Sequence, residues 1–442
     1  MKRGFSLGGV HPHDNKISKD AVIEDFPVLE KAYISMSQHL GAPAEPVVQK
    51  GDKVKVGQVI GKPAGFISAY IHSSVSGTVV AIEPVADIQG NMVMTVVVEV
   101  EGDEWIETID RSNNIVEDIA LSPKEILEKI AGCGIVGLGG ASFPTHVKLS
   151  PPPGKKAEFL IINGAECEPF LTSDYRLMVE MTEQMIIGSM IMAKALGVKR
   201  CYIGVEENKP EAIKKIRSFS SKYPSVEVVE LRMMYPQGGE KQLIDAVVKR
   251  RVPSMGLPID VGVVVQNVGT AFAVYEAVQK NKPLIDSIVT VTGKFAREQR
   301  NFRLRVGTPI DKMIDSVGGL PRDAVKVISG GPMMGKAIAN FQGASVKATS
   351  AVLIMAEEET KRNPESNCIR CAKCVEVCPM GLEPYLLNKL AIADRYDDLE
   401  ANKIYDCMEC GCCLYTCPAN IPLLDNIRIA KAEVMKIMRS RK

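Results

Sequence analysis

The sequence contains no apolar run as long as the roughly 18 residues that a membrane-spanning helix needs. Its most apolar helical stretch, Met185 to Ala193, is interrupted by Lys194. The first residues carry no apolar segment behind their charges, so a signal peptide is not expected. The net charge is only +1, and a single tryptophan with 5% aromatic residues leaves few rings for base stacking. These shortages argue against an integral membrane protein, and we expect no nucleic-acid partner.

Hydrophobic residues make up 46% and charged residues 24% of the 442 positions, which is the composition of a folded globular chain. At roughly 100–200 residues per domain, this length predicts two to four domains. Nine of the 12 cysteines lie at or after Cys368. A disulfide scaffold would spread its cysteines along a short secreted chain. The crowding at one end therefore predicts metal binding in a reducing compartment.

The first part of the sequence divides into two regions. Residues 1–110 are the N-terminal region, and its residues 43–85 contain short apolar runs separated by glycine-centred turns, which predicts a small β unit. Within it, residues 43–85 resemble the barrel-sandwich fold of lipoyl and biotinyl carrier domains. The turn at residues 72–74, where a carrier would hold its modified lysine, reads His-Ser-Ser, so a structural unit is favoured over a carrier. Residues 111–287 alternate strand-like and helix-like patterns, which predicts an α/β domain with a largely parallel sheet.

The second part is also divided. Residues 288–345 begin with a β-like run and include an amphipathic segment, which predicts a compact mixed unit similar to a β-grasp domain. Residues 341–367 are interpreted as a connector. Residues 346–442 are expected to form a linker and a cysteine-rich helical unit, because residues 386–405 have helical spacing.

Two cysteine runs with the same spacing follow one another near the end of the chain. Each has gaps of two, two and three residues and ends in Cys-Pro, which is the bacterial ferredoxin pattern. Three closely spaced cysteines reach three corners of one [4Fe–4S] cubane, and the fourth cysteine of each run binds the other cubane. The expected ligands are therefore crossed: Cys368, Cys371, Cys374 and Cys417 for cluster 1, and Cys407, Cys410, Cys413 and Cys378 for cluster 2.

Zinc is the alternative occupant of these cysteines, because zinc sites use paired cysteines or cysteine with histidine. No histidine follows His146, and eight cysteines match the ferredoxin pattern, so iron–sulfur clusters are favoured. Cys412 is left over and is interpreted as a neighbour of a cluster rather than a ligand.

A glycine-rich loop lies in the α/β region, where residues 137–148 read Gly-Leu-Gly-Gly-Ala-Ser-Phe-Pro-Thr-His-Val-Lys. Three glycines let backbone N–H groups approach an anion closely, and Lys148 adds a charge suited to a phosphate. A predicted strand then ends in residues 163–169, Asn-Gly-Ala-Glu-Cys-Glu-Pro, which places Glu166 and Glu168 where α/β sheets bind ligands. A structural turn and a solvated acidic loop are the alternatives.

Four motifs in the same order resemble the flavoprotein subunit of respiratory complex I. The glycine loop is similar to its Gly-x-Gly-Gly-Ala-x-Phe-Pro-Thr-x-x-Lys flavin loop, and residues 163–169 to its Asn-x-Asp-Glu-x-Glu-Pro. The other two are residues 235–243, Tyr-Pro-Gln-Gly-Gly-Glu-Lys-Gln-Leu, and residues 265–270, Val-Gln-Asn-Val-Gly-Thr. Together with the barrel-sandwich region, Gly8-Gly-Val-His-Pro, Gly330-Gly-Pro-Met-Met-Gly and the ferredoxin tail, they make the whole chain resemble the C subunits of Rnf ion-translocating ferredoxin:NAD oxidoreductase complexes.

The resemblance implies a Rossmann-like α/β domain that binds FMN non-covalently and exchanges hydride with NAD(H). It implies that FMN is held by Gly137, Gly139, Gly140, Lys148, Asn163, Tyr235, Gly238 and Asn267. It places Phe143, Glu166, Glu168 and Glu240 near the nicotinamide nucleotide, with Glu168 and Glu240 as catalytic candidates. Ala165, Gly239 and Gln266 stand where the relative has Asp, Glu and Asn, so the individual flavin hydrogen bonds are left open.

The cofactors fit one another chemically. NADH gives two electrons together and a cubane moves one at a time, so a flavin with two clusters converts between the two. We therefore expect an α/β multidomain, peripheral oxidoreductase subunit at the cytoplasmic face of the membrane, held there by other subunits of an Rnf-type complex. A diaphorase subunit of a soluble hydrogenase or formate dehydrogenase, and a redox adaptor without a nucleotide, are the alternatives. Cys133 and Cys167 lack a local base and are not expected to act as nucleophiles.

The end of the chain is basic. Residues 426–442 carry six Lys and Arg side chains against one acid, Glu433, beside an apolar face. A solvated helix on the ferredoxin unit is the simpler interpretation. Docking to a partner or to an anionic membrane surface is the alternative.

Overall fold

The computed structural model describes residues 2–322 and 324–441 of the chain. Its first unit is a β sandwich, in which apolar residues such as Ile34, Ile60, Ile71 and Val98 are buried between two sheets. The sheets have the orders β2-β8-β7-β4 and β3-β5-β6. The strands are β2 (Lys31–Ser35), β3 (Glu45–Pro46), β4 (Lys53–Val54), β5 (Val59–Lys62), β6 (Ile71–His72), β7 (Gly77–Ala86) and β8 (Met92–Val100). The turn at residues 72–74 is buried and offers no exposed attachment point for a carrier group.

The second unit is a parallel α/β domain. Its strands are nearly continuous apolar runs, because helices cover both faces of the sheet and bury a separate core on each face. The sheet contains β9 (Phe159–Gly164), β10 (Arg200–Glu206), β11 (Val226–Leu231) and β12 (Val263–Asn267). The helices are α1 (Pro123–Gly132), α2 (Thr145–Lys148), α3 (Ser173–Glu180), α4 (Thr182–Leu196), α5 (Pro210–Ser218), α6 (Glu240–Val248), η1 (Pro258–Val261) and α7 (Val268–Lys280).

The order of these strands creates a position for a ligand. The sheet reads β11-β10-β9-β12, and every neighbouring pair is parallel. The chain therefore leaves β9 toward one side and later returns to its other side, so the connections diverge between β9 and β12. Ligands of open α/β sheets bind at such a switch point, beyond the carboxyl ends of the strands. The register pairs Asn163 with Asn267 at this edge.

A mixed sheet forms the third unit, with the order β1-β14-β13-β17-β15-β16. Its elements are β1 (Ile23–Asp25), β13 (Asp286–Thr292), β14 (Arg300–Arg305), α8 (Ile310–Ser316), β15 (Ala324–Ser329), β16 (Lys336–Ala337) and β17 (Ala351–Ala356). The prediction of a connector over residues 341–367 is wrong, because β17 is a central strand that pairs with both β13 and β15. Every residue of β17 is buried. A strand that is buried on both faces lacks the alternation by which a sequence indicates a strand.

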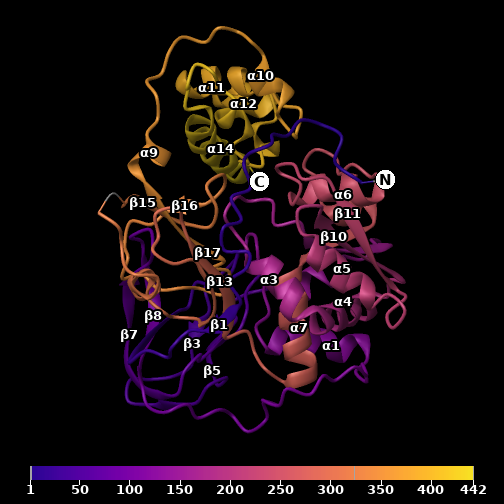
Figure 1. Cartoon of the computed structure of the whole chain (residues 1–442), viewed down its shortest axis with the longest axis vertical. Coiled ribbons are helices and arrows are strands. Elements are labelled where there is room, and N and C mark those ends of the chain that lie inside the picture. Colours follow the sequence, from indigo (N-terminus) through magenta and orange to yellow (C-terminus); the bar gives the residue numbers. More distant parts are fainter. Residues whose placement is uncertain (1, 323, 442) are drawn as a thin grey trace.

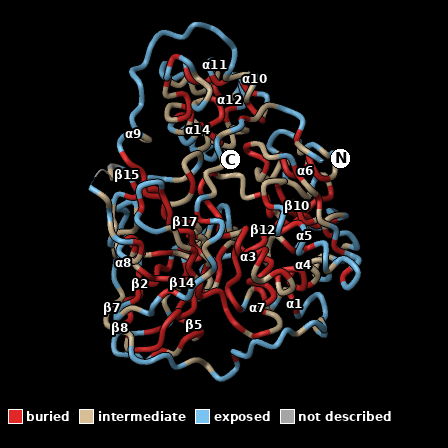
Figure 2. The backbone as a smooth tube through the Cα atoms, in the orientation of Figure 1, coloured by how far each residue is buried: buried red, intermediate tan, exposed pale blue. Residues whose placement is uncertain are grey.

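A helical unit ends the chain and caps the molecule at the top of Figure 1. Its helices are α10 (Lys373–Glu376), α11 (Pro384–Ile392), α12 (Tyr396–Ala401), η2 (Ile404–Asp406), α13 (Cys412–Tyr415) and α14 (Leu423–Ser440), preceded by α9 (Glu357–Thr360). They pack around a small core that includes Leu387, Leu399, Ile427 and Val434. An exposed segment, residues 361–372, arches over the unit and joins it to the third unit, as the pale tube in Figure 2 shows.

The basic side chains near the C-terminus pair mainly within this helical unit. Arg428 and Lys431 both reach Glu409, at 3.2 and 2.9 Å. Arg441 binds Asp397 and Glu400 at 2.8 and 2.7 Å, and Lys442 lies outside the described residues. These pairs favour the interpretation of α14 as a helix of the ferredoxin unit. Among the helices of the described residues, none is long and apolar enough to cross a membrane.

A buried lysine joins the first three units. The Nζ atom of Lys347, just before β17, donates to the carbonyl oxygens of Tyr70 in the β sandwich and Gly134 in the α/β domain, both at 2.7 Å. The Lys347 side chain is buried, and this burial lowers its pKa to about 7. A neutral amine keeps its N–H groups for both carbonyls without the cost of a buried charge.

This lysine predicts a pH dependence of stability. Between pH 7 and pH 10 the lysine is protonated in the unfolded chain but largely neutral in the folded chain, so the free energy of unfolding should rise with pH. The contribution can reach about 1.4 kcal/mol per pH unit. Lys347→Met should remove this rise, which thermal unfolding of both proteins at several pH values would detect. Parallel profiles for the two proteins would contradict the assignment.

Candidate functional site

Two asparagines define the switch point of the parallel sheet. Asn163 is the last residue but one of β9, and its Nδ2 donates to the Gly238 carbonyl at 2.8 Å. Asn267 ends β12 and caps α7, because its Oδ1 accepts from the Gly269 amide at 2.6 Å. The Nδ2 of Asn267 donates to Asp174 at 2.7 Å. Both predicted flavin-binding asparagines thus lie side by side at the strand ends, where they orient neighbouring loops.

The glycine loop is anchored beside Asn267. The Gly137 amide donates to the Phe143 carbonyl, and the Leu138 amide to Thr270 Oγ1 in α7, both at 2.8 Å. Gly139 has a φ of +74°, and a Cβ atom there would lie 2.9 Å from the Asn267 amide nitrogen. This position therefore needs glycine both for its backbone conformation and for its close approach to β12.

The top of the loop is open. A Cβ atom added at Gly140 would meet no heavy atom within 4 Å among the described residues. The amides of residues 139–141 donate to no acceptor in the described part of the chain. Unbonded backbone amides at a loop beside a helix N-terminus form a concavity that suits an anion such as a phosphate. The loop therefore fits the phosphate-bearing flavin that the sequence predicts.

Lys148, at the end of the loop sequence, forms an ion pair with Glu240. Lys148 ends α2, Glu240 begins α6, and the Nζ and Oε1 atoms are 2.5 Å apart. The side chains remain 31% and 40% exposed, so both can exchange partners with an arriving ligand. The predicted phosphate contact and the predicted nucleotide contact thus share one ion pair.

The two other predicted acids make backbone contacts. The Glu166 carboxylate accepts from the amides of Asp174 and Tyr175, at 2.7 and 3.2 Å, at the start of α3. The Glu168 carboxylate accepts from Met333 and Met334, at 3.1 and 2.7 Å, in the glycine-rich loop of the third unit. Burial raises the pKa of Glu168 to about 7. In this structure the carboxylates of Glu166 and Glu168 orient α3 and the third unit, respectively.

Three ionisable groups near these acids, the buried Lys209 and the partly buried Lys16 and Asp174, were not predicted from the sequence. Lys16 donates to the carbonyls of Glu166 and Glu168 at 2.8 and 2.9 Å. Lys209 donates to the Ala165 carbonyl at 2.6 Å. The Asp174 carboxylate accepts a hydrogen bond from the Asn267 side-chain amide. Burial is the largest cause that raises the pKa of Asp174, and the charge of Glu166 raises it further. Lys16 and Lys209 lie far from residues 163–169 in the sequence and outside every recognised motif, so no sequence signal marks them.

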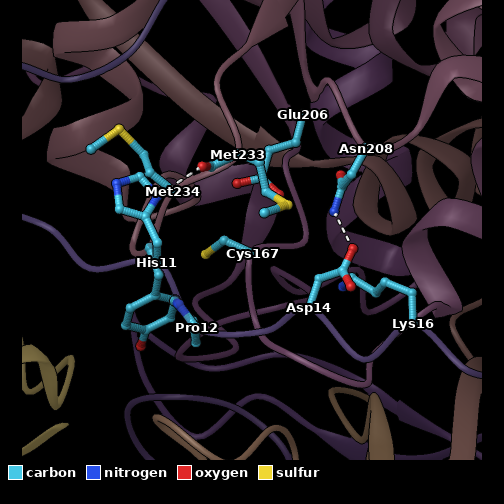
Figure 3. Close-up of a pocket in the computed structure, with 10 residues that line it drawn as sticks. His11, Pro12, Asp14, Lys16, Cys167, Glu206, Asn208, Met233 and Met234 are labelled. Atoms are coloured by element: carbon cyan, nitrogen blue, oxygen red, sulfur yellow. Dashed lines mark hydrogen bonds between the residues drawn. The ribbon is translucent and has the colours of Figure 1, made fainter.

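A small cavity lies behind the same loop, lined by residues that include His11, Cys167, Glu206 and Met233 (Figure 3). Its volume is about 10 Å³, which is close to the space of one water. Burial raises the pKa of Cys167 to about 12, and its sulfur accepts from the Gly238 amide at 3.3 Å. Burial also raises the pKa of Cys133, to about 11. Neither thiol is activated as a nucleophile would be.

The flavin-type site borders the cysteine-rich unit. Tyr235 is fully buried, and its hydroxyl donates to the Cys410 carbonyl at 2.9 Å. Gln242 Nε2 donates to the Pro379 carbonyl at 3.1 Å. A Cβ atom at Gly239 would lie 2.7 Å from Met408 Cε. Glycine in place of the Glu of the complex I subunit therefore leaves room for the cysteine-rich unit.

The structure brings the cysteines together across the two runs. Cys374 packs in one apolar cluster with Cys417. Burial raises the pKa of Cys374, and the charges of Cys417 and Cys371 raise it further. The other group combines Cys378 with cysteines of the second run. Burial is the largest cause that raises the pKa of Cys413 to about 12, and the charges of Cys407, Cys410 and Cys378 add to it. Cys368 is exposed at the start of the first run. Cys412 is buried, and its thiol donates to the Tyr235 carbonyl at 3.8 Å.

This donor set fits iron–sulfur clusters. Buried thiols with raised pKa values stay protonated unless iron supplies compensating positive charge, and bound iron deprotonates them. Both cysteine runs have the spacing of the ferredoxin pattern, with eight cysteines in two sets of four, whereas a single zinc ion takes four ligands in all.

A glycine loop at the switch point of a parallel sheet, with paired cysteine runs packed against the neighbouring residues 235–242, defines a flavin-dependent electron-transfer protein with iron–sulfur clusters. Four family models match the chain in order: "RnfC Barrel sandwich hybrid domain" over residues 5–103, "Nuo51 FMN-binding domain" over residues 130–276, "SLBB domain" over residues 288–337 and "4Fe-4S dicluster domain" over residues 360–418.

Two curated relatives, both C subunits of ion-translocating ferredoxin:NAD(+) oxidoreductase complexes, are similar over nearly their whole length. The relative from the proton-translocating complex of Clostridium ljungdahlii is 46% identical, over 96% of this chain and 93% of that protein. The relative from the Na(+)-translocating complex of Acetobacterium woodii is 43% identical, over 98% of each chain. A solved structure of an NAD+-reducing [NiFe]-hydrogenase matches 71% of this chain and 62% of that chain, with 18% identity and a TM-score of 0.48. The chain belongs to the family of C subunits of Rnf-type ion-translocating ferredoxin:NAD oxidoreductase complexes.

Proposed function

We propose that this chain is the subunit of an Rnf-type complex that exchanges hydride between NAD(H) and FMN and passes single electrons between the flavin and partner subunits. Bound FMN would supply the step between two-electron and one-electron chemistry, and two [4Fe–4S] clusters the one-electron steps. The observation that carries the proposal is the contact of one segment, residues 235–242, with both sites. Its Gly238 binds the switch-point Asn163, while Tyr235 and Gln242 bind the two cysteine runs.

We assign the roles of individual residues as the motifs imply. Gly137, Gly139, Gly140, Lys148, Asn163, Tyr235, Gly238 and Asn267 would hold FMN. Phe143, Glu166, Glu168 and Glu240 would line the nucleotide side. The open amides of residues 139–141 and the partly exposed Lys148–Glu240 pair support these assignments. Glu240 is the better catalytic candidate of the two acids, because the Glu168 carboxylate already receives two backbone amides.

The cysteine ligands are assigned as crossed sets. Cluster 1 would be held by Cys368, Cys371, Cys374 and Cys417, and cluster 2 by Cys407, Cys410, Cys413 and Cys378. The charges of Cys417 and Cys371 raise the pKa of Cys374, and those of Cys407, Cys410 and Cys378 raise the pKa of Cys413, which supports this division. The cluster 2 residues lie against the flavin domain, whereas Cys368 and Cys371 are exposed and accessible to a partner.

The division into regions and the finer fold types belong to the same proposal. Residues 1–110 would include the barrel sandwich, residues 111–287 a Rossmann-like domain, residues 288–345 a β-grasp-like domain, and residues 346–442 a linker and the ferredoxin unit. The strand order β11-β10-β9-β12 supports the Rossmann-like assignment. Because β17 completes the third sheet, we place the end of the third domain after residue 356.

NADH titration of anaerobically purified protein tests the function. We expect NADH to bleach a bound flavin and then to produce the EPR signals of reduced clusters, with about eight irons per chain. Protein that binds the clusters but neither flavin nor NADH would instead support the redox-adaptor alternative.

Lys148 and Glu240 should have separable effects. Lys148→Ala removes a charged phosphate contact worth about 1.5–3 kcal/mol, so the Kd for FMN should rise roughly tenfold to 150-fold. Glu240→Ala leaves Lys148 free for the phosphate, so FMN should remain bound while its reduction by NADH slows. Fluorescence titration and stopped-flow absorbance would measure the two effects. Lys155→Ala is a matched control, because Lys155 also pairs with an acid, Asp260 at 2.9 Å, away from the glycine loop.

We further propose that the chain is a peripheral protein at the cytoplasmic face, attached through the membrane subunits of its complex. Its nucleotide substrate would be cytoplasmic, and its clusters require a one-electron partner. Fractionation of native extract at low salt should place the chain with membranes, together with integral subunits. Recovery wholly in the soluble fraction at low salt, without such subunits, would support the soluble diaphorase instead.

A further inference from the structure

The N-terminal strap, residues 7–10, is wedged between the flavin domain and the ferredoxin unit. In Figure 1 the indigo end of the chain runs from the α/β domain past the yellow helices before it descends to the β units. The Gly9 amide donates to the Val377 carbonyl at 2.9 Å. Val10 and Tyr235 exchange two backbone hydrogen bonds, both at 2.8 Å. One short segment therefore binds both sides of this junction.

The strap contacts the Cys378 loop of the proposed cluster 2 ligand set directly, and it reaches the Cys410 loop through Tyr235. Gly8 packs so closely that a Cβ atom there would lie 2.6 Å from the carbonyl carbon of Cys378. On its other side, Val10 packs with Tyr235, whose hydroxyl donates to the Cys410 carbonyl. Cys378 and Cys410 come from different runs. Their relative position therefore depends on what binds both loops.

The connection between the two units makes this contact important. Residues 361–372, the covalent link from the third unit to the ferredoxin helices, are exposed along their length. An exposed link cannot hold the helices at one position, so non-covalent contacts must do so. The strap is one of these contacts, and it lies at the ligand loops themselves.

We propose that the N-terminal strap is a positioning element for cluster 2, holding the Cys378 loop and the Cys410 loop against the flavin domain. This inference rests on the proposed function, because it presumes that the crossed cysteine set holds a cluster. Gly8 is the critical residue. Its φ of +67° and its contact with the Cys378 backbone leave no room for a side chain.

Gly8→Ala tests the proposal, with Gly102→Ala as the matched control. Gly102 has nearly the same φ, +65°, but a Cβ atom there meets nothing within 4 Å in the described chain. Both variants thus carry the same backbone strain, and only Gly8→Ala displaces the Cys378 loop. We expect Gly8→Ala to change or lose the EPR signal of cluster 2, while flavin content and the cluster 1 signal stay as in Gly102→Ala. Electron transfer from NADH to a one-electron acceptor should slow roughly tenfold to a hundredfold.

Identical EPR spectra and midpoint potentials for the two glycine variants would overturn the proposal. If Gly8→Ala does not fold, Leu7→Ala replaces it, because the Leu7 side chain lies 3.2 Å from the Cβ position of Gly381, just after Cys378. A shifted cluster 2 potential in Leu7→Ala would support the strap, and an unchanged potential would contradict it. Failure of the proposed function is distinguishable, because the unaltered protein would then lack the flavin or the clusters.

Discussion

Replacing Cys378 with alanine should remove the cluster bound mainly by the second run and spare the cluster of the first run. Cys378 belongs to the first run in sequence, but its charge raises the pKa values of Cys407 and Cys413 in the second run, and also that of their neighbour Cys412. A cubane that loses one of four thiolates loses a covalent ligand, so the expected iron content falls from about eight to about four per chain. Electron transfer from NADH to one-electron acceptors should fall with it.

The reciprocal variant makes this experiment decisive. Cys417→Ala should remove the cluster of the first run, so the EPR spectra of the two variants should add up to that of the unaltered protein. Cys412→Ala is the control, because Cys412 is a buried neighbour that is not assigned as a ligand. It should retain both clusters. Loss of the first-run cluster alone in Cys378→Ala would disprove the crossed arrangement.

Gly140→Leu should yield a folded protein without FMN. The backbone at Gly140 tolerates a side chain, since its φ lies outside the left-handed region, and its Cβ position opens into free space within the described structure. A leucine side chain would therefore cost little folding stability but would fill the concavity formed by the amides of residues 139–141. We expect an unchanged melting temperature for the apoprotein, intact clusters, and no flavin after purification.

Gly132→Leu separates the loss of space from the general effect of an added side chain. Gly132 also has no heavy atom within 4 Å of its Cβ position among the described residues, but it lies at the end of α1 and outside the glycine loop. This variant should keep its FMN. Full flavin retention in Gly140→Leu would show that the space above Gly140 is solvent and that FMN binds elsewhere.

Some features could be predicted from the sequence because they depend on residues close together in the chain. The spacing of the cysteine runs reflects how three thiolates reach one cubane, and the glycine loop reflects the needs of a few consecutive amides. The alternation of apolar strands and amphipathic helices likewise identified the α/β domain. The family, the FMN and [4Fe–4S] cofactors, and the electron-transport function expected from these motifs are confirmed by the family models and relatives. The roles of individual site residues stay predictions.

Other features were decided only by the tertiary structure, because they join residues that are far apart and carry no periodic signal. The sequence alone could not show that Lys148 pairs with Glu240, or that the Glu168 carboxylate binds the amides of Met333 and Met334. It also could not place β17 at the centre of the third sheet, since a strand buried on both faces looks like any apolar run. The N-terminal strap is the extreme case. Gly8 and Cys378 are separated by most of the chain, and only packing of the folded units brings their backbones into contact.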